Sequence, residues 1–413
     1  MRDKEIKRYV TGQQLGLLGG PLYTTYKVLG ALKYAAVEKG EAVYWLETND
    51  ADFNEINRIH YIDSKKELRS LKWDIGSNGF SCGSIKVDEK LISILNVFFD
   101  TITQTEYTSE LRESVLNFYR LGKTLGEASA SLAKYLFGDF GIKIFDPSDR
   151  DFREFCKPIL IREAMRTPDG EQCNLFYMDG LKRKSVFREG GSFVSREGKT
   201  VDIEKYDLVP SLKTRSICQD AYFGTTGYLA GPGEVKYLSE LEPNYRFHKI
   251  KPAKVIPRMS IDLIEPDVKR NMGKLSLDIT DIDVYGMDDM IRKKIKETTG
   301  FDKKEILKDA ENLKSVFIDG IENLGLSTGK LKKHLDREIK GMVGLKRKSD
   351  KEKSLSATKR IEMIYKRLKP FGIKQERVFN IFYFMNLYGG RGLIKSIFNG
   401  YEDSRITMEI GNG

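Results

Sequence analysis

The chain has 413 residues, a formal net charge of +10, 40% hydrophobic residues and 31% charged residues. This length and composition indicate a soluble globular protein with two or three domains. No apolar run reaches about 18 residues, so we expect no membrane span. Residues 1–8 lack the apolar stretch of a secretory signal, and we expect a cytoplasmic protein.

The spacing of cysteines and histidines argues against a metal site. No C-x-x-C pair occurs, and the three histidines are dispersed along the chain. We therefore predict no protein metal site, and we expect reduced thiols of the cytosolic kind. The cysteines are Cys82, Cys156, Cys173 and Cys218.

A glycine-rich segment joins the first predicted strand to the first predicted helix. Residues 9–13 are a strand candidate, residues 22–39 have helical periodicity and residues 42–47 form a buried strand. Glycine lets the backbone approach a ligand, and a helix N-terminus offers free N–H groups to an anion. The order predicts a parallel sheet with a loop that binds phosphate or carboxylate, although tight structural turns are the alternative. The glycines are Gly12, Gly16, Gly19 and Gly20.

An acidic segment follows the second predicted strand directly. Asp50, Asp52 and Glu55 lie where a parallel sheet binds its ligands, at the carboxyl ends of the strands. Carboxylates there can hold Mg²⁺, bind a substrate ammonium group or act as a base. The alternative is that Asp50 or Asp52 caps a short helix.

Two insertions are predicted between the strands of the core. Residues 88–137 show helical periodicity, and residues 143–146 look like the end of another strand. Residues 171–208 contain short strand candidates separated by glycine-rich turns, which predicts a small β insertion.

A second candidate ligand loop lies near the end of the core. A predicted helix at residues 213–222 is followed by a strand that runs into a Gly-Pro-Gly loop at residues 226–234, where a new helix begins. Residues 254–258 are predicted to form a further strand.

Residues 285–370 are charged and helical, with two apolar stripes separated by a turn at residues 325–329. The last four residues of the second stripe step by 4, 3 and 4, which is the spacing of a coiled coil. We predict an antiparallel helical stalk whose exposed stripe forms a homodimer, with a bundle packed on the core as the alternative. The stripes are Ile306, Leu313, Val316, Phe317 and Ile321, then Leu335, Ile339, Met342, Ala357, Ile361, Ile364 and Leu368.

The fold expectation is therefore an α/β protein with a Rossmann-like parallel core in residues 1–270, the stalk in residues 285–370, and residues 371–413 packing back on the core. The basic run at residues 346–353 is typical of a solvated helix face, and no nucleic-acid motif accompanies it. We do not expect a nucleic-acid partner.

Together these segments resemble the bacillithiol biosynthesis cysteine-adding enzymes, a family of cysteine ligases. The residues that carry the resemblance occur in the family's order over nearly the whole chain. They are Thr11-Gly-Gln-Gln14, Gly16, Gly20-Pro-Leu-Tyr-Thr24, Trp45, Asp50, Asp52-Phe53, Glu55-Ile-Asn57, Asn174-Leu-Phe176, Ala230-Gly-Pro-Gly-Glu234, Tyr237, Pro257-Arg258, Gln375-Glu-Arg377, Asn380, Tyr383, Asn386 and Tyr388-Gly389.

The resemblance implies a ligase that joins the carboxyl group of cysteine to the amine of glucosaminyl malate, with a coiled-coil homodimer. Because amide formation from a free carboxylate is uphill, it also implies activation by a nucleotide, ATP or ADP, with Mg²⁺ as a possible companion. The candidate catalytic residues are Lys27, Asp50 and Asp52. The candidate substrate- or nucleotide-binding residues are Thr11, Gly12, Gln13, Gln14, Gly16, Gly19, Gly20, Tyr23, Thr24, Trp45, Asn49, Gly231, Gly233, Glu234, Tyr237 and Arg258.

Two departures from the family pattern qualify this expectation. The family carries Glu-Asp-His-Asp where this chain reads Asn49-Asp50-Ala51-Asp52, and alanine cannot transfer a proton. The family also carries a segment before the Gly-Gln-Gln loop, and its stalk is longer. One alternative is therefore a homologue that binds a nucleotide or an amino acid without this activity. A second alternative, which rests on the basic stalk, is a nucleic-acid-binding coiled-coil dimer.

Overall fold

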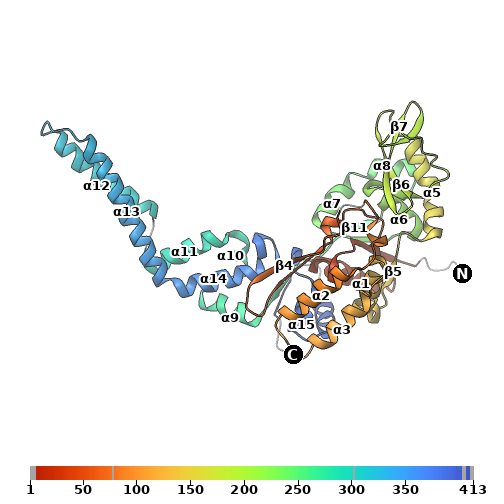
Figure 1. The fold of residues 1–413 in the computed structure, drawn as a ribbon, viewed down its shortest axis with the longest axis horizontal. Helices are drawn as coiled ribbons and strands as arrows, with labels where there is room; N and C mark the ends of the chain where they lie inside the picture. Colours follow the sequence, from red (N-terminus) through yellow and green to blue (C-terminus); the bar gives the residue numbers. More distant parts are fainter. Residues whose placement is uncertain (1–5, 77–78, 301–302, 402–405, 410–413) are drawn as a thin grey trace. The chain divides into compact units, whose positions relative to one another are not determined.

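The computed structural model describes residues 6–76, 79–300, 303–401 and 406–409 (Figure 1). The chain forms two compact units, one made of Met1–Leu263 and Gln375–Gly413 and the other of Ile264–Lys374. Within the residues that are described, no helix combines the length and apolar content needed to cross a membrane.

A five-stranded sheet lies at the centre of the first unit. Its strand order is β11-β10-β1-β2-β5, and all neighbours pair in parallel, which confirms the predicted Rossmann-like α/β core. The chain order reverses between β1 and β10, and open sheets of this kind bind ligands at such a point, beyond the carboxyl ends of the strands. The strands are β1 (Arg8–Gln14), β2 (Glu41–Glu47), β5 (Lys143–Phe145), β10 (Gly227–Ala230) and β11 (Lys254–Pro257).

Helix α1 (Leu22–Glu38) connects β1 to β2 and is buried along most of its length. Its buried face consists mainly of apolar residues packed on the sheet, as the helical periodicity predicts. Lys27 is an exception, because it lies in this buried face with only 1% of its surface exposed. A buried cation requires a partner, and this one belongs to the candidate site.

The segment between β2 and β5 is helical in the predicted range, where it forms three α-helices, and it also contains a hairpin that the sequence analysis missed. The three helices bury leucine and phenylalanine side chains in the main core. The hairpin strands pair antiparallel, with Ile59 opposite Leu71. The elements are β3 (Arg58–Ile62), β4 (Leu68–Lys72), α2 (Glu89–Thr101), α3 (Thr108–Phe118) and α4 (Leu125–Phe137).

The predicted β insertion is a four-stranded antiparallel sheet of order β8-β7-β6-β9. It packs with the helices on either side of it around a second apolar cluster that includes Phe152, Leu175 and Trp45. The elements of the insertion and its flanking helices are α5 (Arg150–Met165), β6 (Gln172–Asp179), β7 (Lys182–Glu189), β8 (Ser192–Ser195), β9 (Leu208–Pro210) and α6 (Leu212–Phe223). Helices α7 (Pro232–Ser239) and α8 (Glu242–His248) follow β10 and belong to another apolar cluster.

The end of the chain returns to the first unit. The carboxamide of Gln375 donates to the carbonyl oxygen of Leu263 at 3.1 Å and accepts from its N–H at 3.0 Å. Strand β13 (Ile406–Glu409) pairs with β12 (Ile261–Ile264), and α15 (Ile381–Leu387) is buried in the main core. A short helix, α16 (Gly392–Asn399), follows α15.

The second unit contains six α-helices among the described residues. Four of them, α9, α10, α11 and α14, enclose an apolar cluster, while α12 and α13 pack against each other as a hairpin. The elements are α9 (Pro266–Lys274), α10 (Ile279–Val284), α11 (Met287–Thr299), α12 (Lys303–Glu322), α13 (Gly329–Lys353) and α14 (Leu355–Leu368).

The prediction of one continuous second stripe in this unit was wrong. The helix breaks at Ser354, where α13 ends and α14 begins. Ile361, Ile364 and Leu368 lie on α14 and are buried in the cluster with α9, α10 and α11, not against α12. Their spacing is that of a buried helix face, which cannot be distinguished from a coiled-coil seam over so short a length.

A buried ionic cluster around Glu163 of α5 ties three elements of the first unit together. Its carboxylate lies 2.8 Å from Nε2 of His248 and 2.9 Å from Nε of Arg166. The side-chain amides of Asn174 and Asn244 donate to the same carboxylate at 2.9 and 3.2 Å. Burial acts to raise the pKa of Glu163, but the contacts with His248, Asn174 and Arg166 outweigh it and hold the pKa at about 2.

This cluster predicts an acid-sensitive contribution to stability. Because the pKa of Glu163 is lowered in the folded state, its contribution is present above the ordinary carboxylate pKa and is lost as the pH falls towards 2. We expect Glu163→Gln to reduce the free energy of unfolding by roughly 3 kcal/mol at pH 7, and the difference from wild type to shrink between pH 5 and pH 3. Urea unfolding of both proteins across this pH range measures the difference in the free energy of unfolding. A pH-independent difference, or an equal effect of the control Glu171→Gln, would contradict the prediction.

Candidate functional site

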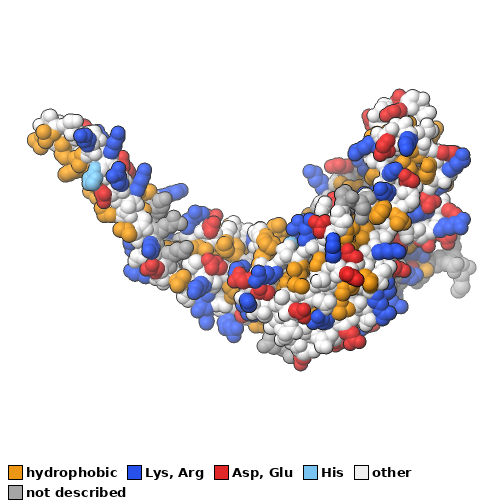
Figure 2. Space-filling model, viewed as in Figure 1, with side chains coloured by type: hydrophobic (Ala, Val, Ile, Leu, Met, Phe, Trp, Pro, Cys, Tyr) orange, Lys and Arg blue, Asp and Glu red, His pale blue; other side chains and the backbone are white. Residues whose placement is uncertain are grey.

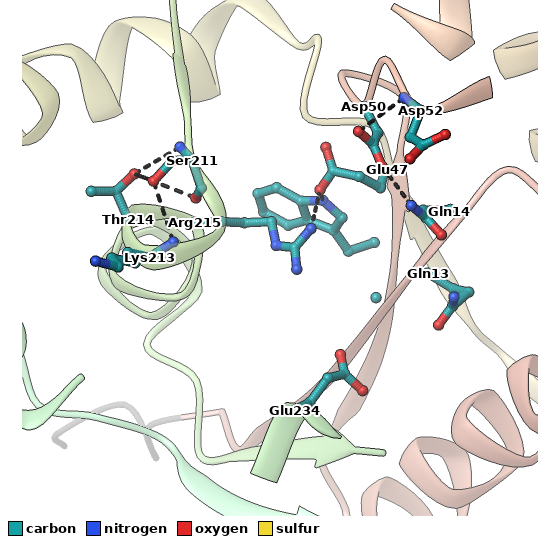
Figure 3. Close-up of polar contacts among 12 residues, drawn as sticks. Gln13, Gln14, Glu47, Asp50, Asp52, Ser211, Lys213, Thr214, Arg215 and Glu234 are labelled. Carbon is teal, nitrogen blue, oxygen red and sulfur yellow. Dashed lines mark hydrogen bonds and ion pairs between the residues drawn. The ribbon is translucent and has the colours of Figure 1, made fainter. Parts of the chain in front are cut away.

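A cavity of about 490 Å³ opens beyond the carboxyl ends of β1, β2, β10 and β11. Figure 3 shows side chains from β1, the segment after β2, α6 and α7 facing this space. Most of the predicted site residues line it. They are Gly12, Gln13, Gln14, Tyr23, Lys27, Asp50, Gly231, Gly233, Glu234, Tyr237 and Arg258.

The remaining predicted residues, Thr24 among them, do not line this cavity. Thr11 is fully buried and its hydroxyl donates to the carbonyl oxygen of Leu229, while Trp45 is buried beneath the site. Asn49 is buried and accepts a hydrogen bond from Arg153. Asp52 caps a short 3-10 helix, η2 (Phe53–Glu55), by accepting from the N–H of Asn54, which is the structural alternative that the sequence left open.

The loop of residues 16–20 does not present its N–H groups to the cavity. The N–H groups of Gly16, Gly19 and Gly20 donate to carbonyl oxygens within the loop or just before it. Those of Leu17 and Leu18 donate to the carbonyl oxygen of Ile56 and the hydroxyl of Tyr119. The expectation that this loop cradles a phosphate is therefore not met in this conformation. A Cβ on Gly16 would lie 2.5 Å from Cα of Gly20, so close backbone packing requires this glycine.

Lys27 reaches from α1 to the two loops that border the cavity. Its ammonium group donates to the carbonyl oxygen of Gly12 at 2.6 Å and to the carboxylate of Glu234 at 2.7 Å. Glu234 also accepts from the N–H of Gly231 and from the hydroxyl of Tyr228. Burial lowers the pKa of Lys27, while Glu234 opposes this shift.

Asp50 is held by hydrogen bonds and one cation at the opposite side of the cavity. It accepts from the side-chain amide of Gln14 at 2.6 Å and from Arg183 at 2.9 Å. Burial acts to raise its pKa, but Gln14, Arg183 and the backbone N–H groups of Asp52 and Ala51 hold the pKa below its ordinary value. Asp50 is therefore a fixed negative charge and a poor proton acceptor at neutral pH.

The sequence analysis missed several side chains that line the cavity. Arg215, in the first turns of α6, donates to Glu47 at the end of β2 at 2.7 Å. The guanidinium of Arg183 on β7 lies 4.4 Å from the ring centre of Phe176 on β6. Arg183 and Arg215 lie far in the sequence from Asp50 and Glu47, and neither arginine belongs to a local motif. Phe176 lies in a segment of the family resemblance. Arg377 is another lining residue that the sequence analysis missed, whereas Glu55 lines the cavity as the acidic segment predicted.

The N-terminus of α7 borders the cavity, where Pro232 has no N–H group and the N–H group of Gly231 donates to the carboxylate of Glu234. The residue before this helix is Gly231, which has no side chain to cap the first turn. The backbone N–H groups of a first helical turn have no partner within the helix, and they carry the positive end of its dipole. Gly231 and Gly233 both line the cavity. In the described part of the chain, no three potential metal ligands gather at one place.

The N-terminal and C-terminal parts of the chain match two domains of one family. Residues 1–172 and 163–259 match "Bacillithiol biosynthesis BshC, N-terminal Rossmann-like domain". Residues 261–410 match "Bacillithiol biosynthesis BshC, C-terminal coiled-coil domain".

Relatives from several bacteria support the same assignment. The "Putative cysteine ligase BshC" of Salinibacter ruber is 24% identical over 437 residues, which cover 94% of this chain and 80% of the relative. The protein of the same description from Geobacillus sp. (strain WCH70) is 25% identical over 444 residues, or 92% of this chain and 80% of the relative. That from Bacillus cereus (strain ATCC 14579) is 26% identical over 438 residues, or 94% and 81%. With a parallel core, a helical unit and matches over almost its whole length, the chain belongs to the bacillithiol biosynthesis BshC family.

Proposed function

We propose that this protein is a ligase that joins the carboxyl group of cysteine to the amine of glucosaminyl malate, in the cytoplasm. The relatives are described as cysteine ligases of bacillithiol biosynthesis, and that description supports the reaction class. The observation that carries the proposal is a cavity beyond the carboxyl ends of the strands in which a fixed carboxylate and several cations face one space. Such a cavity suits two charged substrates.

Asp50 is the residue that we assign to the ammonium group of cysteine. Its carboxylate stays ionised because its pKa is lowered, and Arg183 and Gln14 fix its direction. An ammonium bound there would direct the carboxyl group of the amino acid into the cavity.

A nucleotide, when bound, would supply the phosphoryl or adenylyl group that makes the cysteine carboxyl reactive. We assign its phosphates to the N-terminus of α7, with Mg²⁺ carried by the nucleotide. Lys27 and Glu234 then have a positioning role, because their ion pair fixes the start of α7 against the Gly12 loop. We assign the exclusion of water to Phe176 and Leu212, two of the apolar side chains that line the cavity.

Ala51 favours one second candidate, a family member that binds nucleotide or amino acid without forming the bond. A methyl group next to Asp50 cannot move a proton, so this candidate predicts binding without turnover. No feature of the comparisons favours the nucleic-acid alternative.

The assignment of Asp50 predicts a large loss of activity from one small change. Asp50→Asn keeps the shape but removes the charge, and we expect kcat/KM to fall about 100-fold or more. Purified protein is incubated with cysteine, ATP, Mg²⁺ and glucosaminyl malate, and the condensed thiol is measured by mass spectrometry. The control Asp74→Asn changes an exposed carboxylate outside the cavity. Full activity of Asp50→Asn would refute this role, and wild-type protein that binds without turnover would favour the second candidate.

The Lys27–Glu234 pair predicts non-additive stability. Lys27→Met alone leaves Glu234 without its cation in a partly buried site, and we expect a loss of roughly 3 kcal/mol in the free energy of unfolding. The double variant Lys27→Met/Glu234→Gln should lose less than the sum of the two single variants. Urea unfolding of all four proteins measures the coupling. Additive losses would show that the pair does not hold the loops together.

We also propose that the α12–α13 hairpin forms a homodimer. Apolar side chains on both helices and their turn are exposed, and Figure 2 shows them gathered on the hairpin. Exposed apolar patches of this kind are typical of protein interfaces, and the match to a coiled-coil domain supports the same role. The exposed residues are Leu313, Val316, Phe317, Leu324, Leu326, Met342 and Leu345.

The dimer proposal predicts a change of mass in solution. We expect sedimentation velocity to show a dimer for the wild type and a monomer for Val316→Glu/Phe317→Glu, because the charges would be buried in the interface. The control Leu181→Glu changes a residue of similar exposure outside the hairpin. A wild-type monomer at micromolar concentration would contradict the proposal.

A further inference from the structure

The cavity is lined by five cationic side chains, and their ion pairs divide them into two groups. Four of them lie 2.7–2.9 Å from a carboxylate. Arg377 also lines the cavity, but it has no carboxylate partner among the described residues. The pairs are Lys27–Glu234, Arg183–Asp50, Arg215–Glu47 and Arg258–Glu376.

The backbone on both sides of Arg377 is firmly held. Glu376 forms two hydrogen bonds with Arg258, at 2.7 and 2.9 Å, and Gln375 is fixed by the backbone of Leu263. On the other side, the carbonyl oxygen of Phe379 accepts from the N–H of Leu22 at the start of α1. Arg377 itself is exposed. The neighbours thus fix where the side chain starts while its guanidinium group stays accessible.

Arg377 lies close enough to the rim residue Tyr23 to act on it electrostatically. Burial raises the pKa of Tyr23, and the charge of Arg377 acts in the opposite direction. Glu55 lines the same cavity, but no ion pair joins it to Arg377 in the described structure. A ligand anion at a paired cation would compete with a carboxylate, whereas at Arg377 it would not.

We propose that Arg377 is the residue of this cavity that binds the anionic group of an incoming substrate, a carboxylate or a phosphate. A guanidinium group offers two parallel N–H donors that match either oxyanion. The inference rests on the proposed function only for the identity of the substrates. The anion can come from glucosaminyl malate, from the nucleotide or from cysteine, which all carry such a group.

Direct binding measurements test this inference separately from catalysis. Isothermal titration calorimetry is performed with L-cysteine, glucosaminyl malate and ADP in turn, on wild type, Arg377→Gln and Arg377→Lys. We expect Arg377→Gln to weaken the binding of at least one of the three ligands by about tenfold or more. Arg377→Lys should restore part of this affinity, because lysine keeps the charge but lacks the two parallel N–H donors of a guanidinium group. The weakened probe identifies the source of the anion. The thermal unfolding midpoint should not change, because Arg377 has no ion pair to lose.

Two controls make the result decisive. Arg246→Gln removes an exposed arginine outside the cavity and should leave all three affinities unchanged. Glucosamine, which lacks the malate carboxylates, should bind wild type and Arg377→Gln equally. Equal affinities of wild type and Arg377→Gln for all three anions, or no binding of any of them to wild type, would overturn the inference. Weaker binding by Arg377→Gln in a protein without ligase activity would support it and refute the proposed function.

Discussion

The buried ammonium group of Lys27 is the contact on which the shape of the site depends. It joins the carbonyl oxygen of Gly12, at the end of the central strand, to the carboxylate of Glu234 in the first turn of α7. Glu234 in turn fixes Gly231 and Tyr228. Because a buried charge without a partner is costly, the glycine-rich loop and the start of α7 have to stay together. The charged side chains of the cavity are arranged around this fixed edge.

Much of the fold followed from local patterns. The β-loop-α-β order at the start of the chain predicted the parallel sheet, and α1 and β2 lie within a residue of the expected positions. The β3–β4 hairpin was missed because its strand β4 is mostly exposed and short. The break at Ser354 was missed for a different reason. The apolar spacing of Ile361, Ile364 and Leu368 continues the pattern of α13, and only tertiary packing shows that these residues belong to another cluster.

The sequence predicted where the site lies on the sheet, but it did not predict most of the contacts that the side chains make there. Strand ends marked Gln14, Asp50 and Glu234 correctly as lining residues. The role of a glycine-rich loop could not be inferred from composition, because the same glycines allow tight backbone packing in which the loop satisfies its own N–H groups. Arg183 lies on β7 of the β insertion and Arg215 on α6 after it, so only the folded chain brings their charges to Asp50 and Glu47.

The path of the chain also sets when the site can form. The first unit is interrupted after Leu263 and resumes only at Gln375, where Glu376 supplies the carboxylate for Arg258. During synthesis, the strands and the cavity loops leave the ribosome before Glu376 is made. Arg258 therefore has no carboxylate partner until the residues of the helical unit, 264–374, have been synthesised. The last segment therefore acts as a closing step in assembly. A chain released before residue 375 would hold all five strands of the sheet, but its cavity would lack Arg377 and its Arg258 would have no carboxylate partner.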